Sequence, residues 1–528
     1  MKISVENLVL SAKNQPREID TLLQPHIAAK CGIHVSDVLS YRIVKWSIDA
    51  RRKGDVKLLY TLVADVPDNV KSAFPLLPAP EEPAPEEKFV NRSGIQSPII
   101  VGAGPAGLFA AYVLALAGCR PVVLERGRSV DARKFDIDGF LAARKLNPES
   151  NFLYGEGGAG TWSDGKLFTR IRDGRIRFIL NTFVECGADQ SIAYFSHPHI
   201  GSDRLPQIVA ALRRKIMALG GTFRWNARAE KLLIREGKCR GVLLASGEKA
   251  EAPAVIAACG HSARSFILSL VSAGVKYSMK GFQIGCRIEH PQSYINRIQF
   301  GVSEAPPCVG NAEYNFVSRP TGNGKISGAT SFCMCPGGEI IPSTAEEGRL
   351  STNGMSNAAR NGRYANSAIV TTVSEKEFSS PLQAFTFLDE LEKKVFSSGG
   401  GDYTCPAQSA LDFLRRTAGS GKLFSSYPLG LKSARLDEIL PGNVFESLRR
   451  ALKHFDGMAP SFIERGLLAG LETHVSSPVR FERDPETLCS SLPGLYTAGE
   501  GAGMAGGITS SAADGIRMAE ALLSRPNL

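Results

Sequence analysis

The chain has 528 residues, 43% of them hydrophobic, and carries 62 Lys and Arg against 52 Asp and Glu, a formal net charge of +10. This length suits about two or three domains, and no run of roughly eighteen apolar residues argues for a membrane-spanning helix. The basic residues are dispersed and do not form a run with interleaved aromatics, so nucleic-acid binding is not expected from the charge alone.

The N-terminal sequence MKISVENLVL mixes charged and apolar residues, so it does not resemble a secretory signal, and a cytoplasmic location is expected. The eleven cysteines follow no regular framework, which favours reduced thiols over disulfides in a chain of this size. Their spacing also lacks a paired CxxC zinc signature, so no metal site is predicted.

Residues 1–66 are predicted to form a small α+β module. An apolar strand at 2–10 precedes a helix through 22–32, and two strands at 38–48 and 56–66 are joined by a Lys-Gly-Asp turn that suits a hairpin. Residues 67–96 are rich in Pro and Glu and are predicted to be an extended, poorly packing linker.

Residues 98–126 have the spacing of a dinucleotide-binding βαβ unit. Gly102 suits the tight turn after an apolar strand, Gly104 allows close approach of a pyrophosphate, and Gly107 allows the helix to pack on the sheet. The helix that starts near Pro105 would point free amides at the phosphates. Glu125 ends the second strand at the position where an acid binds the hydroxyls of an adenosine ribose.

The chain after this unit is predicted in less detail. Residues 131–146 and 204–219 are expected to be helices, and 222–259 a three-stranded meander that ends in an apolar strand. From 281 to 475 the pattern changes to mixed strands and loops with helices at 381–396 and 443–454, which indicates an inserted cap or substrate domain.

The C-terminal segment offers a second constellation. The apolar strand at Leu495–Tyr496 leads to Gly499 and Glu500, and Gly507 precedes a helix that begins near Ile508. The carboxylate could bind a hydroxyl chain, and the helix end could stabilise negative charge on a reduced flavin ring. Ligands of open α/β sheets bind where such strand ends meet, so the early and late glycine turns are expected to converge.

With these two segments the chain resembles the FAD-dependent oxidoreductases of the glutathione-reductase-like, two-fingerprint superfamily. More narrowly it resembles an uncharacterised group of FAD-dependent dehydrogenases, on the motifs GEGGAGTWSDGKL (155–167), HPHIGSD (197–203), GCRIEHPQ (285–292), SFCMCPGG (331–338), NGMSNAARNGRYANSA (353–368), LETHVSSPVR (471–480) and GEGAGMAGGITSSAADG (499–515), and on SIDARRK (47–53) in the N-terminal unit.

The resemblance implies FAD as cofactor and an α/β fold with three parts. These are a small N-terminal α+β domain, a Rossmann-like FAD-binding domain built from 97–280 and 476–528, and an inserted mixed α+β cap at 281–475. The implied FAD-binding residues are Gly102, Ala103, Gly104, Pro105, Ala106, Gly107, Glu125, Arg126, Gly157, Gly158, Gly165, Ala229, Gly260, Gly499, Glu500, Gly507 and Ile508. Glu500 stands where the superfamily usually has Asp.

Three side chains are candidates for chemistry beside the flavin. Lys166 could place positive charge near the ring or near an acidic substrate, or it could pair with Asp164 on a solvated turn. His199, with His197, could serve as acid or base, and a structural role beside the following helix is the alternative. Arg480 could reach the substrate side of the ring together with His474, or these two could bind backbone carbonyls.

Cys333 and Cys335 are two residues apart, so in a regular strand both would face one side, and a bond between them would be strained. They are interpreted as small apolar residues that line the cap, with electron exchange with the flavin as the alternative.

The sequence therefore predicts an FAD-dependent oxidoreductase that acts on an unidentified small molecule. No strand-preceded GxGxxG occurs between 261 and 490, and RTAGSGK (416–422) lacks Walker spacing. The reductant would be the substrate, transiently bound NAD(P)H or a protein donor. Two other hypotheses stay open: an FAD-binding redox sensor or adaptor that acts through a partner protein, and an RNA-modifying flavoprotein.

Overall fold

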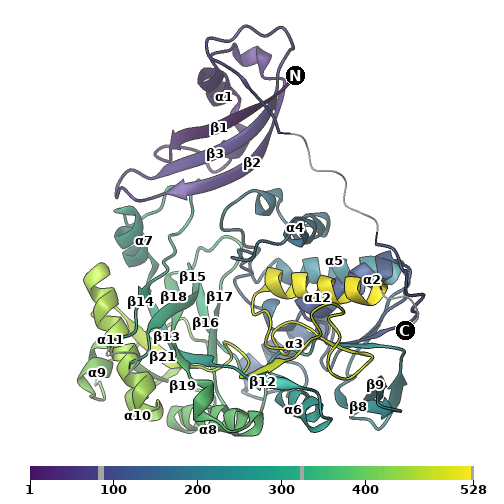
Figure 1. Cartoon of the computed structure of the whole chain (residues 1–528). Coiled ribbons are helices and arrows are strands. Elements are labelled where there is room, and N and C mark those ends of the chain that lie inside the picture. The colour runs from purple at the N-terminus through teal and green to yellow at the C-terminus, as the bar shows by residue number, and fades with distance from the viewer. Residues whose placement is uncertain (81–88, 322–325, 420, 525–528) are drawn as a thin grey trace.

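The computed structural model describes residues 1–80, 89–321, 326–419 and 421–524. Residues 81–88 of the expected linker, and residue 420 of the RTAGSGK segment, lie outside the described residues. Figure 1 shows a small N-terminal unit above a larger body in which a parallel sheet with its helices lies beside a second, mostly antiparallel sheet.

The N-terminal unit is a four-stranded sheet of order β2-β3-β1-β4. In β3 (Lys57–Asp65), buried and partly exposed residues alternate along the first part of the strand. Its buried residues include Leu58, Tyr60 and Leu62, as expected of a half-buried strand. Its elements are β1 (Lys2–Ser11), α1 (Gln24–Cys31), β2 (Ser40–Asp49), β3 (Lys57–Asp65) and β4 (Leu77–Pro78). The first four were predicted, whereas β4 was not. β4 lies within the segment expected to be a linker, and it pairs with β1.

The parallel sheet has the order β23-β11-β5-β6-β7, so strands from the start, middle and end of the chain pair side by side. Ile100 in β5 faces the core formed with the helices, whereas Ile99 and Val101 face the opposite core. The strands are β5 (Ile99–Val101), β6 (Val122–Leu124), β7 (Thr222–Arg224), β11 (Val255–Ala257) and β23 (Leu495–Thr497).

Helices cover this sheet, and three of them, α2, α5 and α12, lie together in Figure 1. α2 and α12 touch through their backbones, because a Cβ built on Gly515 would lie 2.0 Å from the carbonyl oxygen of Ala106. The helices of this part are α2 (Pro105–Leu116), α3 (Val130–Ala143), α4 (Arg175–Glu185), α5 (Leu205–Ala218), α6 (Arg264–Ser272) and α12 (Ile508–Ser524).

The predicted meander at 222–259 is wrong in its first strand. Thr222–Arg224 is β7 and pairs in parallel with β6, at the edge of the Rossmann-like sheet. The antiparallel meander consists of β8 (Ala229–Arg235), β9 (Lys238–Leu244) and β10 (Lys249–Glu251). Alternation of apolar residues does not distinguish an edge strand of one sheet from the first strand of another.

The cap is a seven-stranded sheet of order β14-β15-β18-β13-β21-β19-β20. Its strands are β13 (Phe282–Pro291), β14 (Val317–Ser318), β15 (Ala329–Cys335), β18 (Tyr364–Val373), β19 (Cys405–Ser409), β20 (Leu431–Ser433) and β21 (Leu467–Glu472). Two-stranded pairings add β16 (Glu339–Pro342) with β17 (Thr352–Met355), and β12 (Tyr277–Met279) with β22 (Val479–Phe481). The cap helices are α7 (Gln292–Phe300), α8 (Pro381–Gly399), α9 (Ala410–Arg415), α10 (Leu436–Ile439) and α11 (Gly442–Met458).

The N-terminal sheet docks on the body through β2. Trp46 exchanges backbone hydrogen bonds with Tyr194 and Ser196, both 2.8 Å, and its ring stacks on Phe195 with centroids 4.3 Å apart.

Across the described residues, no helix combines the length and the apolar character that crossing a membrane requires.

Candidate functional site

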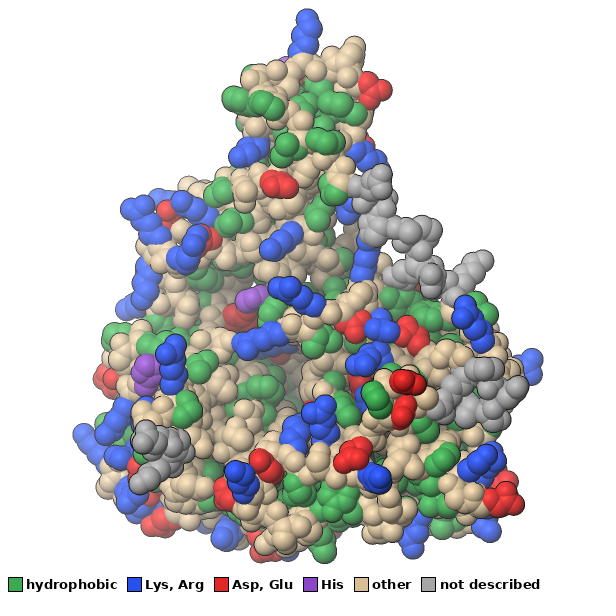
Figure 2. All heavy atoms as spheres, viewed as in Figure 1, with side chains coloured by type: hydrophobic (Ala, Val, Ile, Leu, Met, Phe, Trp, Pro, Cys, Tyr) green, Lys and Arg blue, Asp and Glu red, His purple; other side chains and the backbone are tan. Residues whose placement is uncertain are grey.

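A cavity of about 410 Å³ lies at the carboxyl ends of the parallel strands, where they face the cap sheet. Four of the five strands contribute their end or the residue after it, namely Val101, Leu124, Ala258 and Ala498. Figure 2 shows the molecule hollowed on this face, with Lys and Arg side chains near the opening. Volume and position are those of a ligand site in an open α/β sheet.

The early glycine turn is packed as its spacing predicts. Gly102 has φ +102°, and a Cβ on it would lie 2.4 Å from the carbonyl oxygen of Ala258 on the neighbouring strand. A Cβ on Gly107 would lie 1.9 Å from the carbonyl oxygen of Gly102, so α2 packs directly on the turn. Both positions therefore require glycine for close backbone approach.

Gly104 differs from the other two because it has an ordinary φ of −75° and faces open space. The nearest atom to a Cβ built there would be the Cα of Gly158, 4.0 Å away. Gly104 and Gly158 thus form a cradle bare of side chains on the cavity wall. A cradle of this kind lets backbone amides approach a phosphate.

Two helix N-termini point into the same cavity. Gly104 precedes α2 without a side-chain cap, and Pro105 and Ala106 line the cavity. Gly507 and Ile508, at the start of α12, line it too. The early and late segments therefore converge, and both helix ends present positive partial charge to one ligand.

Glu125 joins three segments beneath the cavity. Its buried carboxylate accepts hydrogen bonds from the amides of Ala103 (2.8 Å), Gly127 (2.9 Å) and Gly155 (3.0 Å). A carboxylate has about four acceptor sites. Three of these sites bind backbone amides and one remains for a ribose hydroxyl. Glu125 therefore holds the turn together and can also bind a ligand.

Arg126 lies over the ring of Tyr154 at 3.6 Å from its centroid, and both line the cavity. The loop that carries Tyr154 is held from behind by the fully buried Arg133. That guanidinium donates to the carbonyls of Asn151 (2.7 Å), Glu156 (2.7 Å) and Gly158 (2.9 Å). Sequence reasoning assigned no role to Arg133 or Tyr154, since these contacts join residues from separate elements.

At the opposite wall Glu500 lines the cavity and accepts a hydrogen bond from the amide of Ser477 at 2.9 Å. Burial raises the pKa of Glu500, against the opposing effects of that amide and of Lys280. The Ser477 amide donates to Oε1 of Glu500, so Oε2 is placed to bind a hydroxyl of a ligand.

Lys166 lines the cavity and forms an ion pair with Asp164 at 3.3 Å. Asp164 is buried and is also held by Arg360. Burial alone would raise the pKa of Asp164, but the two cations outweigh it and lower that pKa. The pairing considered from the sequence is therefore present, on a buried carboxylate instead of a solvated turn.

Glu472, at the end of β21, was not singled out from the sequence, and it lines the cavity near Cys333. It accepts a hydrogen bond from the buried Arg287 at 2.7 Å. Burial raises its pKa to about 7, more than Arg287 lowers it. A carboxyl group with a pKa near neutrality at a cavity wall is suited to proton transfer.

His261 and His474 also line the cavity. His474 contacts Ser262 (3.1 Å) and Glu392 (3.3 Å), whereas the buried Nε2 atom of His261 has no hydrogen-bond partner within the described protein. An orphaned polar nitrogen in a cavity wall indicates a polar ligand. With the glycine cradle and the two helix ends, the wall therefore fits a dinucleotide such as FAD.

Most of the residues predicted to bind FAD line this cavity, namely Gly102, Gly104, Pro105, Ala106, Glu125, Arg126, Gly158, Gly165, Ala229, Gly260, Gly499, Glu500, Gly507 and Ile508. Ala103, Gly107 and Gly157 lie behind that wall. Gly157 donates its amide to the Ala103 carbonyl at 2.8 Å, so these residues shape the turn.

Of the three candidates for chemistry, only Lys166 reaches the cavity wall. His199 is held by a contact of 3.1 Å between its Nε2 and the Ala358 carbonyl, and burial lowers its pKa to about 4, which matches the structural alternative. Arg480 lies exposed on β22, which pairs with β12, and it is not among the residues that line the cavity. Neither is therefore placed to touch a substrate in this cavity.

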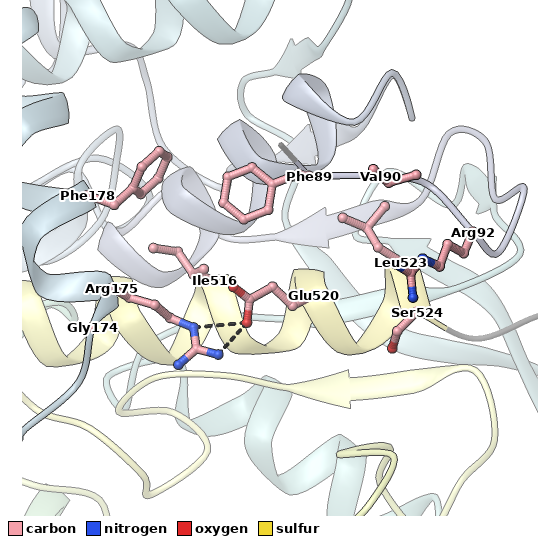
Figure 3. A pocket seen from close by; sticks show the side chains of 10 residues that line it. All are labelled: Phe89, Val90, Arg92, Gly174, Arg175, Phe178, Ile516, Glu520, Leu523 and Ser524. Atoms are coloured by element: carbon pink, nitrogen blue, oxygen red, sulfur yellow. Dashed lines mark hydrogen bonds and ion pairs between the residues drawn. The ribbon is translucent and has the colours of Figure 1, made fainter. Parts of the chain in front are cut away.

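A second cavity of about 350 Å³ lies beside α12 and is lined by Phe89, Phe178 and Leu523, among others (Figure 3). Its acid, Glu520, is paired with Arg175, and Phe89 packs edge-on against Phe178 with centroids 5.5 Å apart.

No set of three or more His, Cys, Asp or Glu side chains in the described part of the chain is arranged to hold a metal ion.

Three segments of the chain match known domain families. Residues 281–475 match a family described as "FAD-dependent protein, C-terminal domain-like", residues 100–145 match an "NAD(P)-binding Rossmann-like domain", and residues 3–65 match a domain of unknown function. The family description of the cap segment points to FAD.

Among solved structures, a geranylgeranyl bacteriochlorophyll reductase-like protein from Thermoplasma acidophilum aligns with a TM-score of 0.34 and 12% identity, over 81% of this chain and 79% of that one. L-proline dehydrogenase from P. horikoshii aligns with a TM-score of 0.35 and 11% identity, over 81% and 93%. Similarity at this level does not bear on function.

An uncharacterised protein of Clostridium beijerinckii is 38% identical over 545 residues, and the match covers 100% of both chains. The chain therefore belongs to the family of that Clostridium protein and carries a Rossmann-like domain and a C-terminal domain of the FAD-dependent protein type.

Proposed function

We propose that this protein is an FAD-dependent oxidoreductase that passes hydride or electrons between a small-molecule substrate and the flavin. The observation that carries the proposal is the convergence of two glycine turns, near 104 and near 507, on one cavity at the ends of the parallel strands. A nicotinamide dinucleotide alone would not need the second helix end.

The early half of the cavity would hold the ADP portion of the cofactor. The bare cradle of Gly104 and Gly158 and the N-terminus of α2 suit the pyrophosphate. The remaining acceptor site of Glu125 suits a ribose hydroxyl. Arg126, stacked on Tyr154, presents a planar cation beside this portion.

The late half would hold the reactive ring. The start of α12 and the cation of Lys166 place positive charge where a reduced flavin becomes negative. Phe168 and Phe332 line the same cavity yet remain 54% and 39% exposed, which gives the mouth an apolar surface for part of a substrate. Glu472 would hold or accept a proton there.

When bound, FAD supplies the hydride and one-electron chemistry, so the protein's residues need only position the substrate and exclude water. The electron donor would be the substrate itself, NAD(P)H bound transiently at the mouth, or a protein that docks there. Between residues 261 and 490 the sequence has no strand-preceded GxGxxG that would hold a resident nicotinamide cofactor.

The experiment that tests the proposal compares the purified protein with a Gly104→Ala variant. The added methyl group meets no protein atom closer than 4.0 Å and demands no unusual backbone angle, yet it enters the cradle. We expect the wild-type protein to show the visible flavin spectrum and the variant to lose roughly tenfold or more in FAD affinity, about 1.4 kcal/mol.

Thermal unfolding of the flavin-free forms is the control, and it should be the same for both proteins. Anaerobic reduction followed by exposure to quinones, oxygen and unsaturated acids then identifies the class of acceptor. A colourless wild-type protein that takes up no added FAD would refute the proposal. A yellow protein that no small acceptor oxidises, but that holds a co-purifying protein, would favour the adaptor hypothesis.

A further inference from the structure

The strand β15 is interrupted where it carries two cysteines. Phe332 pairs with Ala368 and Cys335 pairs with Asn366 on β18, so two residues of β15 face one residue of its partner. Cys333 lies in this bulge with φ +45°, a left-handed conformation that is uncommon for a residue other than glycine. Such local strain persists where surrounding structure enforces it, and it is frequent at functional sites.

The bulge brings the two thiols together. In a regular strand they would lie side by side without facing each other, whereas here the Cys335 thiol approaches the Cys333 carbonyl at 3.3 Å. The Cys335 thiol also forms a side-chain hydrogen bond to the sulfur of Cys333. The strain expected of a bond between residues i and i+2 of a flat strand therefore does not apply to this backbone.

Two cations hold the pair. Arg287 donates to the Cys333 carbonyl at 2.7 Å and lies 3.4 Å from the sulfur of Cys335, and Lys166 donates to the carbonyl of Met334. The hydrogen bond from Cys335 lowers the pKa of Cys333, and Lys166 and Arg287 lower it further against the effect of burial. The pKa of Cys335 is raised by the same hydrogen bond.

The pair lies at the ring end of the cavity. Cys333 lines the cavity together with Lys166. The next residue of that loop, Leu167, accepts a hydrogen bond from Thr509 in the first turn of α12 at 2.7 Å. The thiols are therefore linked through one loop to the helix end that is proposed to face the flavin ring.

We propose that Cys333 and Cys335 form a dithiol–disulfide couple that exchanges two electrons with the flavin across this cavity. The inference rests on the proposed function, because it takes FAD as the oxidant. Cys239 interacts with Cys489 and Cys405 with Cys286, but none of these four lines the cavity. Cys259 is the other cysteine of the described residues that lines it, and no second thiol is recorded beside Cys259. The thiols then serve as an internal store of reducing equivalents beside the ring.

The step balances as follows. With Cys333 as the thiolate, the S–H bond of Cys335 breaks and one S–S bond forms between the two sulfurs. Two electrons and the Cys335 proton pass to the oxidised flavin, so no further proton acceptor is required. Cys333, as the thiolate, is the attacking sulfur in the reverse exchange with an external thiol or disulfide.

The first test follows the sulfur atoms. The holoprotein is equilibrated in mixtures of reduced and oxidised dithiothreitol and then quenched in acid. It is unfolded and alkylated, and its peptides are analysed by mass spectrometry. We expect one intramolecular disulfide between Cys333 and Cys335, which forms or is reduced according to the reduction potential of the mixture. Full alkylation of both residues in the most oxidising mixture would overturn the proposal.

The second test counts electrons in an anaerobic reductive titration. The oxidised wild-type holoprotein should take up about four electrons, two for the flavin and two for the disulfide, whereas Cys333→Ser and Cys335→Ser should each take up about two. Cys186→Ser is the matched control, because Cys186 is buried at the end of α4, away from the cavity, and it should retain the uptake of four.

The two proposals fail differently in this design. A yellow wild-type protein that takes up only two electrons overturns the dithiol couple alone. A colourless protein refutes the flavin function, and with it the exchange, even where the alkylation test finds a disulfide. Flavin content should be equal in wild type and Cys333→Ser, so reduced uptake cannot come from loss of cofactor.

Discussion

At the scale of single residues, the cavity depends on buried charges that bind backbone before they bind any ligand. Glu125 gathers the amides of Ala103, Gly127 and Gly155, and Arg133 gathers three carbonyls of the loop opposite. Hydrogen bonds to charged groups contribute more than neutral ones, roughly 1.5–3 kcal/mol each. These two side chains therefore fix the shape of the turn and of the loop that face each other.

Replacing Glu125 with Ala should lower both stability and cofactor retention. Three buried amides lose their acceptor, and the free energy of unfolding should fall by about 3 kcal/mol or more. Denaturant unfolding and the ratio of flavin to protein absorbance measure the two effects. Glu248→Ala, which removes only a surface partner of Arg224, is the control and should change neither.

Glu472 predicts a specific dependence of stability on pH. Its pKa is raised from 4.5 to about 7 in the folded protein, so its favourable contribution is full below pH 4.5 and is lost as the pH rises through about 7. Relative to Glu472→Gln, the wild type should therefore lose stability between pH 4.5 and 7, on the order of 3 kcal/mol.

Unfolding in denaturant at a series of pH values measures this difference. The Gln variant has no titrating carboxyl group at position 472, so the part of its effect that does not depend on pH shifts its curve as a whole. The slope of the difference between the two curves is therefore the diagnostic quantity. Parallel curves for the two proteins across this interval would contradict the raised pKa.

Residues with a local signal were predictable, and residues placed by distant pairing were not. The spacing of Gly102, Gly104 and Gly107 specifies a turn whose neighbours are known from the sequence alone. Glu472 lines the cavity only because β21 pairs with β13, nearly two hundred residues earlier in the chain. His199 was considered because a histidine titrates near neutral pH, and Arg480 because it precedes the C-terminal flavin segment, and neither is among the residues that line the cavity.

At the scale of elements, the crossing of α2 and α12 determines where the two helix ends point. A Cβ on Gly515 would lie 2.0 Å from the carbonyl oxygen of Ala106, which is backbone and cannot rotate away. Gly515→Ala should therefore separate the helices, cost about 1–3 kcal/mol of stability and weaken flavin retention.

Gly139→Ala is the matched control for this substitution. Gly139 lies in α3, is exposed and has no atom within 4 Å of an added Cβ. Alanine there should raise the free energy of unfolding by about 0.5–1 kcal/mol, since it lowers the entropy of the unfolded chain. Destabilisation by both substitutions to the same extent would show that the crossing is not the cause.

Element type was predictable where periodicity was strong, as in β1, α5 and α11. Partner choice was not, and β7 shows why. Its three residues have the composition of a meander strand, yet β7 pairs with β6, and β8 begins the meander instead. The bulge in β15 is another such case, because nothing local to SFCMCPGG specifies which residues of β18 it faces.

At the scale of the whole molecule, the cavity combines segments from the Rossmann-like sheet and the cap. The N-terminal sheet contributes none of the residues that line the cavity in the described structure. It docks instead on residues 194–196. The residues that follow them in the chain contact side chains and backbone close to the cavity wall. His197 pairs with Glu313 at 2.5 Å, and Lys166 forms a backbone bridge with His199.

This arrangement predicts that Trp46 secures the docking without taking part in cofactor binding. Trp46→Ala keeps the two backbone hydrogen bonds but removes the ring stacked on Phe195. We expect a loss of about 2 kcal/mol of local stability, which corresponds to a roughly thirtyfold faster exchange of the Ser196 amide under native conditions.

Hydrogen exchange followed by peptide mass analysis measures that change, and the flavin spectrum is recorded on the same samples. Val44→Ala is the control, because Val44 lies two residues away on β2 and is 43% exposed. Faster exchange at 194–196 with unchanged flavin content would show a separately docked module. Loss of flavin in the Trp46 variant would instead mean that the N-terminal sheet supports the cavity through His197, Glu313 and Arg360, the side chains that lie between the docking segment and Asp164.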